Sequence, residues 1–160
     1  MERERIAKKV SDSQSEQSYV LMTKHLNGNG RLFGGQLLSW IDDIAGIVAR
    51  RHSQGDAVTA AVDNLIFKSG AKMNDIVVLI GRLTYVGNTS MEIRVDTYVE
   101  TADGMRAMIN RAYLVMVAID ENTNPKQVPR LIIETESEKA EWKAGVKRAQ
   151  LRKIRKIEGF

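Results

Sequence analysis

The stretch NGNGRLFGGQLLSWIDDIAG, residues 27–46, holds the residue types most able to do chemistry. Gly34 and Gly35 come just before an apolar helical run, and Asp42 and Asp43 lie inside it. Glycine serves where a backbone turns sharply or approaches another group closely. The first N–H groups of a helix have no intrahelical partner and can receive a polarised oxygen. A carboxylate nearby adds a general base or a nucleophile, so the stretch predicts either a site or a turn before a helix with surface acids.

A helical wheel separates the two acids. At about 100° per residue, Asp43 falls on the polar side of the helix. Asp42 falls at the margin of the apolar arc, one turn before Ala45 and Gly46, whose small side chains leave room for a substrate or a water molecule. The wheel alone leaves open the other interpretation, in which both acids are solvated surface residues.

Several other chemistries lack their residues. The chain has no cysteine, so it has no disulfide and no thiolate metal site. It contains neither a Gly-x-Ser-x-Gly elbow nor a Gly-Lys-Ser/Thr phosphate loop. His25 and His52 are far apart and are expected at the surface or in caps. Trp40 and Trp142 are expected to be packing anchors. We therefore expect no metal and no cofactor.

Length and charge limit the class of protein. A chain of 160 residues suits one compact domain, and its net charge of +4 is concentrated near the end, where residues 143–160 hold seven Lys or Arg and one Glu. The rest is nearly neutral, so a nucleic-acid partner is not expected, although the tail fits either an anionic partner or a solvated face. The charged N-terminus has no signal-peptide core, which with the lack of cysteine favours a cytoplasmic location.

The periodicity predicts the order of elements. We expect a mobile N-terminal segment over 1–16, a central domain over 17–130 and a basic C-terminal helix over 131–160. Within the domain, helical spacing over 36–52 ends at a glycine stop at Gly55. Alternating residues predict strands over 18–26, 57–67, 75–87, 90–100 and 107–120, with a proline-containing turn over 121–129. A long helix must bury its apolar stripe against the sheet, which predicts an α+β fold with an antiparallel sheet curled around that helix.

Three blocks in this order resemble those of the hotdog-fold acyl-CoA thioester hydrolases. They are NGNGRLFGGQLLSWIDDIAGIVARRHS, VTAAVDNLIF and VGNTSMEIRV, within a similarity that runs from about Tyr19 to Pro129. The resemblance implies a hotdog fold, an acyl-CoA substrate and sites between two hotdogs of a homo-oligomer, as a dimer and further as a trimer of dimers. Coenzyme A then belongs to the substrate and product, with no separate cofactor.

The resemblance also assigns roles to residues. It places the essential acid at Asp42 and the catalytic asparagine at Asn27. It places the tight helix entry, with a backbone N–H that polarises the thioester carbonyl, at Gly34 and Gly35. The positions that match substrate-binding or coenzyme A-binding residues are Thr59, Phe67, Gly87, Thr89, Ser90 and Met91. The chain departs from the family after Phe67, with Gly70 where a proline is usual and Asn74 where a glycine is usual.

Two alternatives remain. A non-catalytic hotdog would bind acyl-CoA as a module or regulator, but no helix-turn-helix signal accompanies it here. A hotdog dehydratase would need a catalytic histidine, for which His25 is the sole candidate. The phosphates of coenzyme A call for basic side chains, and the candidates are Arg82, Arg94, Arg111 and Lys147.

Overall fold

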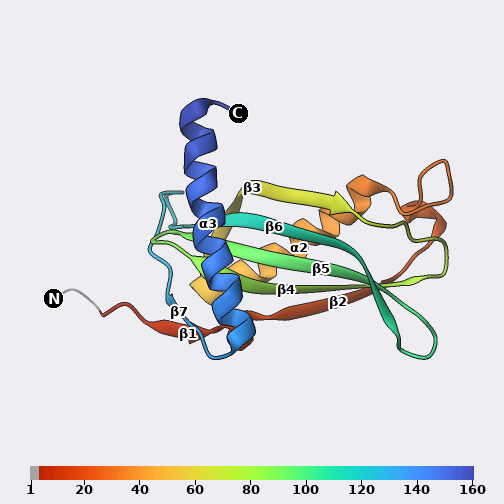
Figure 1. Ribbon diagram of the computed structural model, residues 1–160, viewed down its shortest axis with the longest axis horizontal. Coiled ribbons are helices and arrows are strands. Elements are labelled where there is room, and N and C mark those ends of the chain that lie inside the picture. The colour runs from red at the N-terminus through yellow and green to blue at the C-terminus, as the bar shows by residue number, and fades with distance from the viewer. Residues whose placement is uncertain (1–3) are drawn as a thin grey trace.

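A five-stranded antiparallel sheet wraps around one long helix in the computed structural model, which describes residues 4–160 (Figure 1). The sheet order is β2-β4-β5-β6-β3, and α3 crosses its outer face. The elements are β1 (Ala7–Lys9), α1 (Val10–Ser13), β2 (Ser15–Val20), a 3-10 turn η1 (Thr23–His25), α2 (Gly34–Ser53), β3 (Asp56–Phe67), β4 (Ile76–Val86), β5 (Ser90–Glu100), β6 (Arg106–Ile119), β7 (Arg130–Ile132) and α3 (Glu136–Glu158). The α+β hotdog prediction is confirmed.

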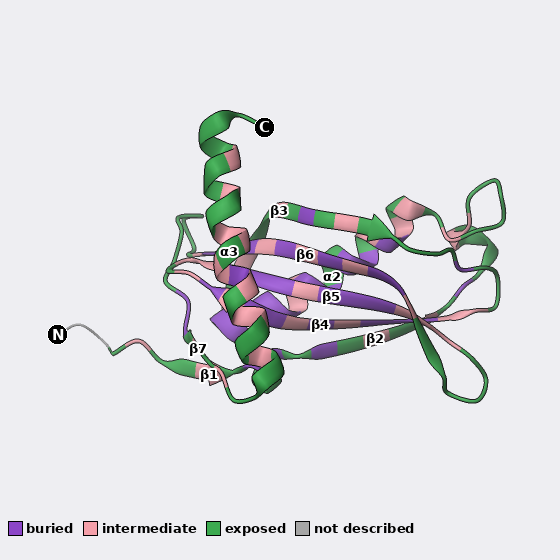
Figure 2. Cartoon of the chain, viewed as in Figure 1, coloured by how far each residue is buried: buried purple, intermediate pink, exposed green. Residues whose placement is uncertain are grey.

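The core lies between α2 and the concave face of the sheet. The buried stripe of α2 consists of Leu37, Trp40, Ile41, Ile44, Ala45, Val48 and Ala49. A Cβ on Gly81 of β4 would lie 3.1 Å from Val48 Cγ2 and 3.4 Å from Ile44 Cγ1. Glycine at this position therefore lets the helix approach the middle of the sheet, where Figure 2 shows the most buried part of the molecule.

The ends of α2 differ from the prediction. The helix begins at Gly34, two residues earlier than expected, so both glycines belong to its first turn. Its left-handed C-terminal residue is Gln54, with φ of 57°, whose N–H donates to the Arg50 carbonyl at 2.9 Å. The glycine stop predicted at Gly55 is therefore wrong by one residue.

The N-terminal segment also differs from the prediction. Residues 1–3 lie outside the described part of the chain, but Ala7–Lys9 form β1, which pairs in parallel with β7, and Val10 is buried. Arg5 Nε donates to the Val128 carbonyl at 2.6 Å. Segment 4–16 is thus built into the fold by partners from the distant end of the domain.

The strand predicted over 18–26 is shorter and starts earlier, as β2 (Ser15–Val20). Beyond its end, Leu21 N–H still donates to the Asp75 carbonyl at 2.9 Å, and Met22 N–H then donates to His25 Nδ1 at 3.0 Å at the start of the 3-10 turn. The other four sheet strands agree with their predicted bounds to within one residue.

Helix α3 begins later than the boundary at 131, because β7 comes first. Thr135 caps it: Glu138 N–H donates to Thr135 Oγ1 at 3.1 Å, and Thr135 N–H donates to the Glu138 carboxylate at 2.9 Å. This reciprocal capping box satisfies two backbone donors of the first turn. Among residues 4–160, no helix combines the length and apolar character needed to span a bilayer.

Ion pairs and one aromatic contact hold α3 on the sheet. Trp142 packs on Tyr85 with ring centroids 4.7 Å apart. Arg148 and Arg152 approach Glu92 of β5, which is fully buried, at 2.7 and 2.8 Å. Arg155 approaches Asp63 of β3 at 2.9 Å. Burying a carboxylate is costly unless it is paired, so Glu92 ties the position of α3 to its arginines.

Replacing Gly81 tests the close packing of α2. We expect Gly81→Val to destabilise the fold by about 1–3 kcal/mol, because the added methyl groups overlap Val48 and Ile44. Gly46→Ala is the matched control, since a Cβ there meets nothing within 4 Å and alanine favours a helix by roughly 0.5–1 kcal/mol. Urea unfolding at fixed protein concentration measures both. A Gly81→Val protein as stable as wild type would contradict this account of the core.

Candidate active site

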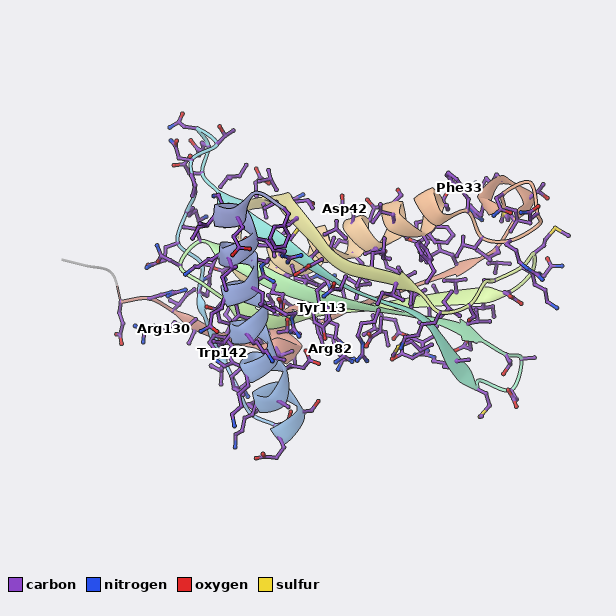
Figure 3. The ribbon with its side chains drawn as sticks, turned by 45° about the horizontal axis from the view of Figure 1, so that its top comes forward. Phe33, Asp42, Arg82, Tyr113, Arg130 and Trp142 are labelled. Atoms are coloured by element: carbon purple, nitrogen blue, oxygen red, sulfur yellow. The ribbon has the colours of Figure 1, made fainter. Side chains whose placement is uncertain are left out.

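Asp42 lies on the exposed flank of α2 beside the edge strand β3 (Figure 3). Thr59 of β3 donates from Oγ1 to Asp42 Oδ1 at 2.6 Å. Within residues 4–160, Asp42 Oδ2 has no hydrogen-bond partner. The contact orients the carboxylate and leaves one oxygen free to accept a proton from water or to attack an electrophile.

Asp43 faces the other side of α2. Burial raises the pKa of the Tyr19 hydroxyl on β2, and the negative charge of Asp43 raises it further. Asp43 therefore lies toward β2, at the opposite edge of the sheet from β3. The Asp43 side chain is exposed. Within the described residues no threonine hydroxyl donates a hydrogen bond to it, in contrast to the bond from Thr59 to Asp42. The helical wheel separated the two acids correctly.

Within the part of the chain that the structure describes, the N–H groups of Gly34 and Gly35 at the start of α2 have no hydrogen-bond partner. Phe33 is its N-cap residue and gives no side-chain hydrogen bond, and the first turn contains no acidic residue. The Phe33 ring covers Gly35, where a Cβ would lie 2.5 Å from Phe33 Cε1. A Cβ on Gly34 would lie 3.5 Å from Phe67 Cζ. Two half-exposed aromatic rings thus flank the positive end of the helix dipole, where a developing oxyanion is stabilised.

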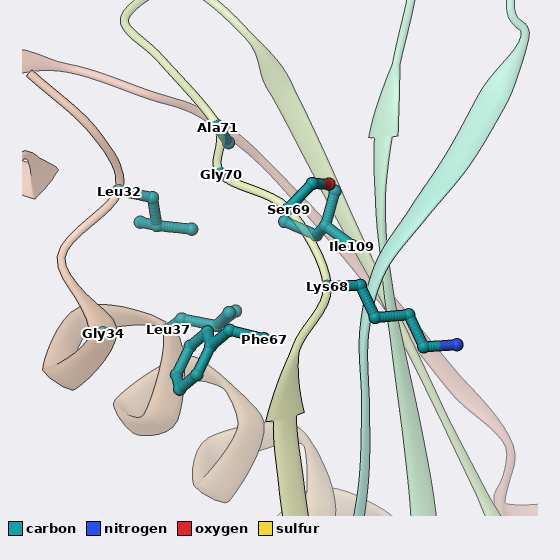
Figure 4. Close-up of a pocket in the computed structure, with 9 residues that line it drawn as sticks. All are labelled: Leu32, Gly34, Leu37, Phe67, Lys68, Ser69, Gly70, Ala71 and Ile109. Carbon is teal, nitrogen blue, oxygen red and sulfur yellow. The ribbon is translucent and has the colours of Figure 1, made fainter.

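A cavity of about 320 Å³ opens beside this helix end (Figure 4). Its lining consists of Leu32, Gly34, Leu37, Phe67, Lys68, Ser69, Gly70, Ala71 and Ile109. The apolar side chains suit a hydrocarbon group, whereas Lys68 and Ser69 supply polar groups. Gly70, at the position usual for proline, is part of this wall.

Asn74 keeps the turn where the family usually has glycine. It adopts a left-handed conformation with φ of 70°, which asparagine tolerates better than most residues. The departure therefore preserves the local backbone.

Asn27 uses its amide oxygen within the glycine loop. Oδ1 accepts from the N–H of Asn29 at 2.9 Å and from the N–H of Arg31 at 3.2 Å. Within the described residues its Nδ2 has no partner. The same side chain can therefore hold the loop and donate a hydrogen bond outward.

The helix itself keeps Asp42 away from the glycine N–H groups of the same chain. Asp42 is seven positions after Gly35, which is about 10 Å along a helix. A thioester carbonyl cannot contact both. One chain therefore holds two candidate half-sites, an acid near Thr59 and a set of donors near Gly35.

The predicted coenzyme A-binding block is split between a turn and the core. Gly87 and Thr89 lie in the turn from β4 to β5 and Ser90 is the first residue of β5, and Gly87 N–H donates to the Ser90 carbonyl at 2.9 Å. Met91 is fully buried. It pairs across the sheet with Met116, which pairs with Thr59 and has its sulfur 3.3 Å from the Thr59 hydroxyl. Met91 supports the floor of the acid half-site and is not exposed to a ligand.

The arginine candidates for phosphate binding are on the other face of the sheet. Arg82, Arg94 and Arg111 surround Asp96, at 3.9, 2.5 and 2.7 Å. Burial raises the pKa of Asp96, but hydrogen bonds from Arg94 and Arg111 outweigh it and hold this pKa below the ordinary value. These side chains point away from α2, so the structure does not bring them to Asp42. Lys147 lies exposed on α3.

Both histidines have structural contacts. His25 Nδ1 accepts from Met22 N–H, and its ring packs edge-on against Trp40, which stacks on Tyr19 with centroids 4.1 Å apart. His52 is buried with Nε2 at 2.9 Å from the Pro129 carbonyl, and burial lowers its pKa. Over residues 4–160 no group of three His, Cys, Asp or Glu is placed to hold a metal ion. The tryptophans are packing anchors, as predicted.

Sequence reasoning missed three residues that shape the site: Phe33, Leu37 and Met116. The role of Phe33 could have been inferred from the sequence, because an aromatic residue directly before a glycine pair is placed to cover it. The role of Met116 could not, because its position under Thr59 depends on the register of β6 against β3.

Comparison with known proteins agrees with this geometry. The family description that matches residues 29–105 is the thioesterase superfamily. An uncharacterised acyl-CoA thioester hydrolase of Bacillus subtilis is 41% identical over 131 residues, covering 81% of this chain and 76% of that protein. The cytosolic acyl coenzyme A thioester hydrolase of Mus musculus is 33% identical over 85% of this chain, which spans only 36% of that longer protein.

Solved structures show the same fold over nearly the whole chain. An apo-hexameric acyl-CoA thioesterase has a TM-score of 0.90 and 35% identity, covering 94% of this chain and 97% of that one. An acyl-CoA hydrolase of Staphylococcus aureus in complex with coenzyme A, with an asparagine replaced by alanine, has a TM-score of 0.93 and 30% identity, covering 98% and 94%. Its variants with alanine for an aspartate or a threonine score 0.92 and 0.90. The chain belongs to the hotdog-fold acyl-CoA thioester hydrolases of the thioesterase superfamily, a family of enzymes.

Proposed function

We propose that this protein hydrolyses acyl-CoA thioesters to a free fatty acid and coenzyme A, in sites shared between two copies of the chain. The observation that supports this most is the pair of half-sites on α2, an acid oriented by Thr59 and an uncapped helix N-terminus under two aromatic rings. The hydrolases among its relatives support the same reaction.

The free edge of β3 gives a way to join the half-sites. Among the strands of residues 4–160, β3 pairs only with β6, so its other edge presents unpaired backbone groups there. Asp42 lies level with Thr59, whereas Gly34 lies level with Phe67, at the other end of β3. Antiparallel pairing of two β3 strands about their midpoints therefore carries the partner subunit's Gly35 toward Asp42. The hexameric relatives support further assembly as a trimer of dimers.

The chemistry then divides between the two chains. Asp42 removes a proton from water, or attacks the thioester carbonyl, with the oxygen that Thr59 leaves free. The N–H of the partner subunit's Gly35 receives the carbonyl oxygen as charge develops, and Nδ2 of the partner subunit's Asn27 orients the carbonyl or the water. One such donor is worth about 10²–10³ in rate.

The Staphylococcus aureus variants support the choice of residues. The asparagine, aspartate and threonine replaced in that acyl-CoA hydrolase are spaced along its chain at the same intervals as Asn27, Asp42 and Thr59 here. The cavity beside Phe67 accepts the acyl chain, and the turn of Gly87, Thr89 and Ser90 remains our predicted contact with coenzyme A. The cytosolic relative supports a cytoplasmic location.

Replacing each aspartate in turn tests the acid. We expect Asp42→Ala to lower kcat by about 10²–10⁴, because it removes the proton acceptor. Asp43→Ala is the matched control and should keep wild-type turnover, since Asp43 faces β2. Thiol release from acyl-CoAs of increasing chain length measures both. A wild-type protein that binds acyl-CoA without releasing thiol would favour the non-catalytic binding module instead.

Asn27→Asp separates the two uses of Asn27. Aspartate keeps an oxygen acceptor for the N–H groups of Asn29 and Arg31, so the loop and the thermal unfolding midpoint should be retained. It loses the Nδ2 donor, so we expect kcat to fall by about 10². Unchanged turnover in Asn27→Asp, together with loss of folding in Asn27→Ala, would show that the residue serves the loop alone.

A further inference from the structure

The end of α3 extends past the edge of its own sheet. Its sheet-facing arginines contact β5 first and β3 last, ending with Arg155 on Asp63. Figure 1 shows α3 continuing past β3. Three helical residues follow Arg155, about 4.5 Å of helix, and Gly159 and Phe160 lie beyond them, whereas the next strand of a sheet lies about 4.8 Å away. The C-terminal turns therefore reach over the position that one further strand would occupy.

These turns carry exposed apolar side chains. Phe160 is 79% exposed and lines the space beside Ala61, Val62 and Asp63 of β3. Ile157 is 85% exposed and, at about 100° per residue, faces away from the side of α3 on which Arg152 and Arg155 meet the sheet.

A groove runs between this helix end and the free edge of β3. Its volume is about 340 Å³, and its lining consists of Ala61, Val62, Asp63, Arg152, Arg155, Lys156 and Phe160. One wall is the unpaired strand edge, which offers backbone hydrogen bonds to an extended segment. The other wall is the last turns of α3.

We propose that the overhang of α3, residues 156–160, is a clasp that covers the β3 strand of a second copy of this chain in the groove. This inference rests on the β3 pairing of the proposed function. Strand β3 has twelve residues, and α3 crosses it at Asp63, one to two residues beyond the midpoint. About the two-fold axis, each clasp then lies over the first half of the partner strand, and the two α3 helices lie about 10 Å apart, a usual distance for packed helices.

The outer face of that first half suits the clasp. Thr59 points inward to Asp42, so the neighbouring Val58 points outward by alternation. Val58 is 47% exposed, and it lies outside the space that α3 of its own chain forms with Ala61, Val62 and Asp63. Phe160 of the partner subunit thus finds an apolar counterpart in Val58, and the contact repeats about the axis.

Removing the apolar side chain that the clasp places in the groove tests the inference. We expect Phe160→Ser to raise the apparent dissociation constant for release of monomer by about tenfold or more, as measured by mass photometry over a concentration series. Met105→Ser is the matched control, because Met105 is 68% exposed in the turn from β5 to β6, away from β3. An unchanged dissociation constant in Phe160→Ser would overturn the inference.

A disulfide gives a second measurement that does not depend on stability. The chain has no cysteine, so the double variant Val58→Cys/Phe160→Cys should form an interchain disulfide under mild oxidation, seen on a non-reducing gel. The single variants should stay uncrosslinked. Absence of the disulfide in a protein that hydrolyses acyl-CoA would overturn the clasp alone. A disulfide in a protein with no thioesterase activity would support the clasp and overturn the proposed function.

Discussion

The burial of one helix by one sheet determines the rest of this structure. Helix α2 has twenty residues, and its apolar stripe is covered only if the sheet curves around it. Gly81 lets the helix approach, and register shifts in β3, β4 and β5 accompany the curvature. A sheet that curls in this way does not close, so the edge of β3 and the flank of α2 with Asp42 are left open together.

The outer face of the same sheet depends on charge instead of apolar burial. Glu92, Asp96 and Asp63 lie under or beside α3 and are paired with arginines. This division explains why a helix with so many basic residues docks on a sheet at all. The inner face supplies the packing free energy, and the outer face sets where α3 lies.

Local pattern predicted most of the fold, and distance in sequence limited the rest. Helix α2 and strands β3 to β6 followed from periodicity, because each pattern extends over ten or more residues. Strand β1 was missed because its partner strand, β7, lies more than 120 residues away in the sequence. The wheel distinguished Asp42 from Asp43, and the same alternation that placed Met91 inward would have placed Arg94 outward, away from the site. The second use of Asn27 and the ring of Phe33 over Gly35 required the folded loop.

Because α2 is rigid, completion of the proposed site depends on how the two β3 strands of the dimer are aligned. Acid and donors are fixed on one helix, so their distance across the two-fold axis changes only when the two β3 strands slide past each other. The side chains of β3 keep their faces of the sheet only when the pairing register changes by two residues. Such a change displaces one chain against the other by about 7 Å. No intermediate alignment exists between a complete site and two separated halves. Misassembled dimers of this chain would therefore have no activity, instead of a reduced activity. The turnover number per protomer would then measure the fraction of chains that are in correctly aligned dimers.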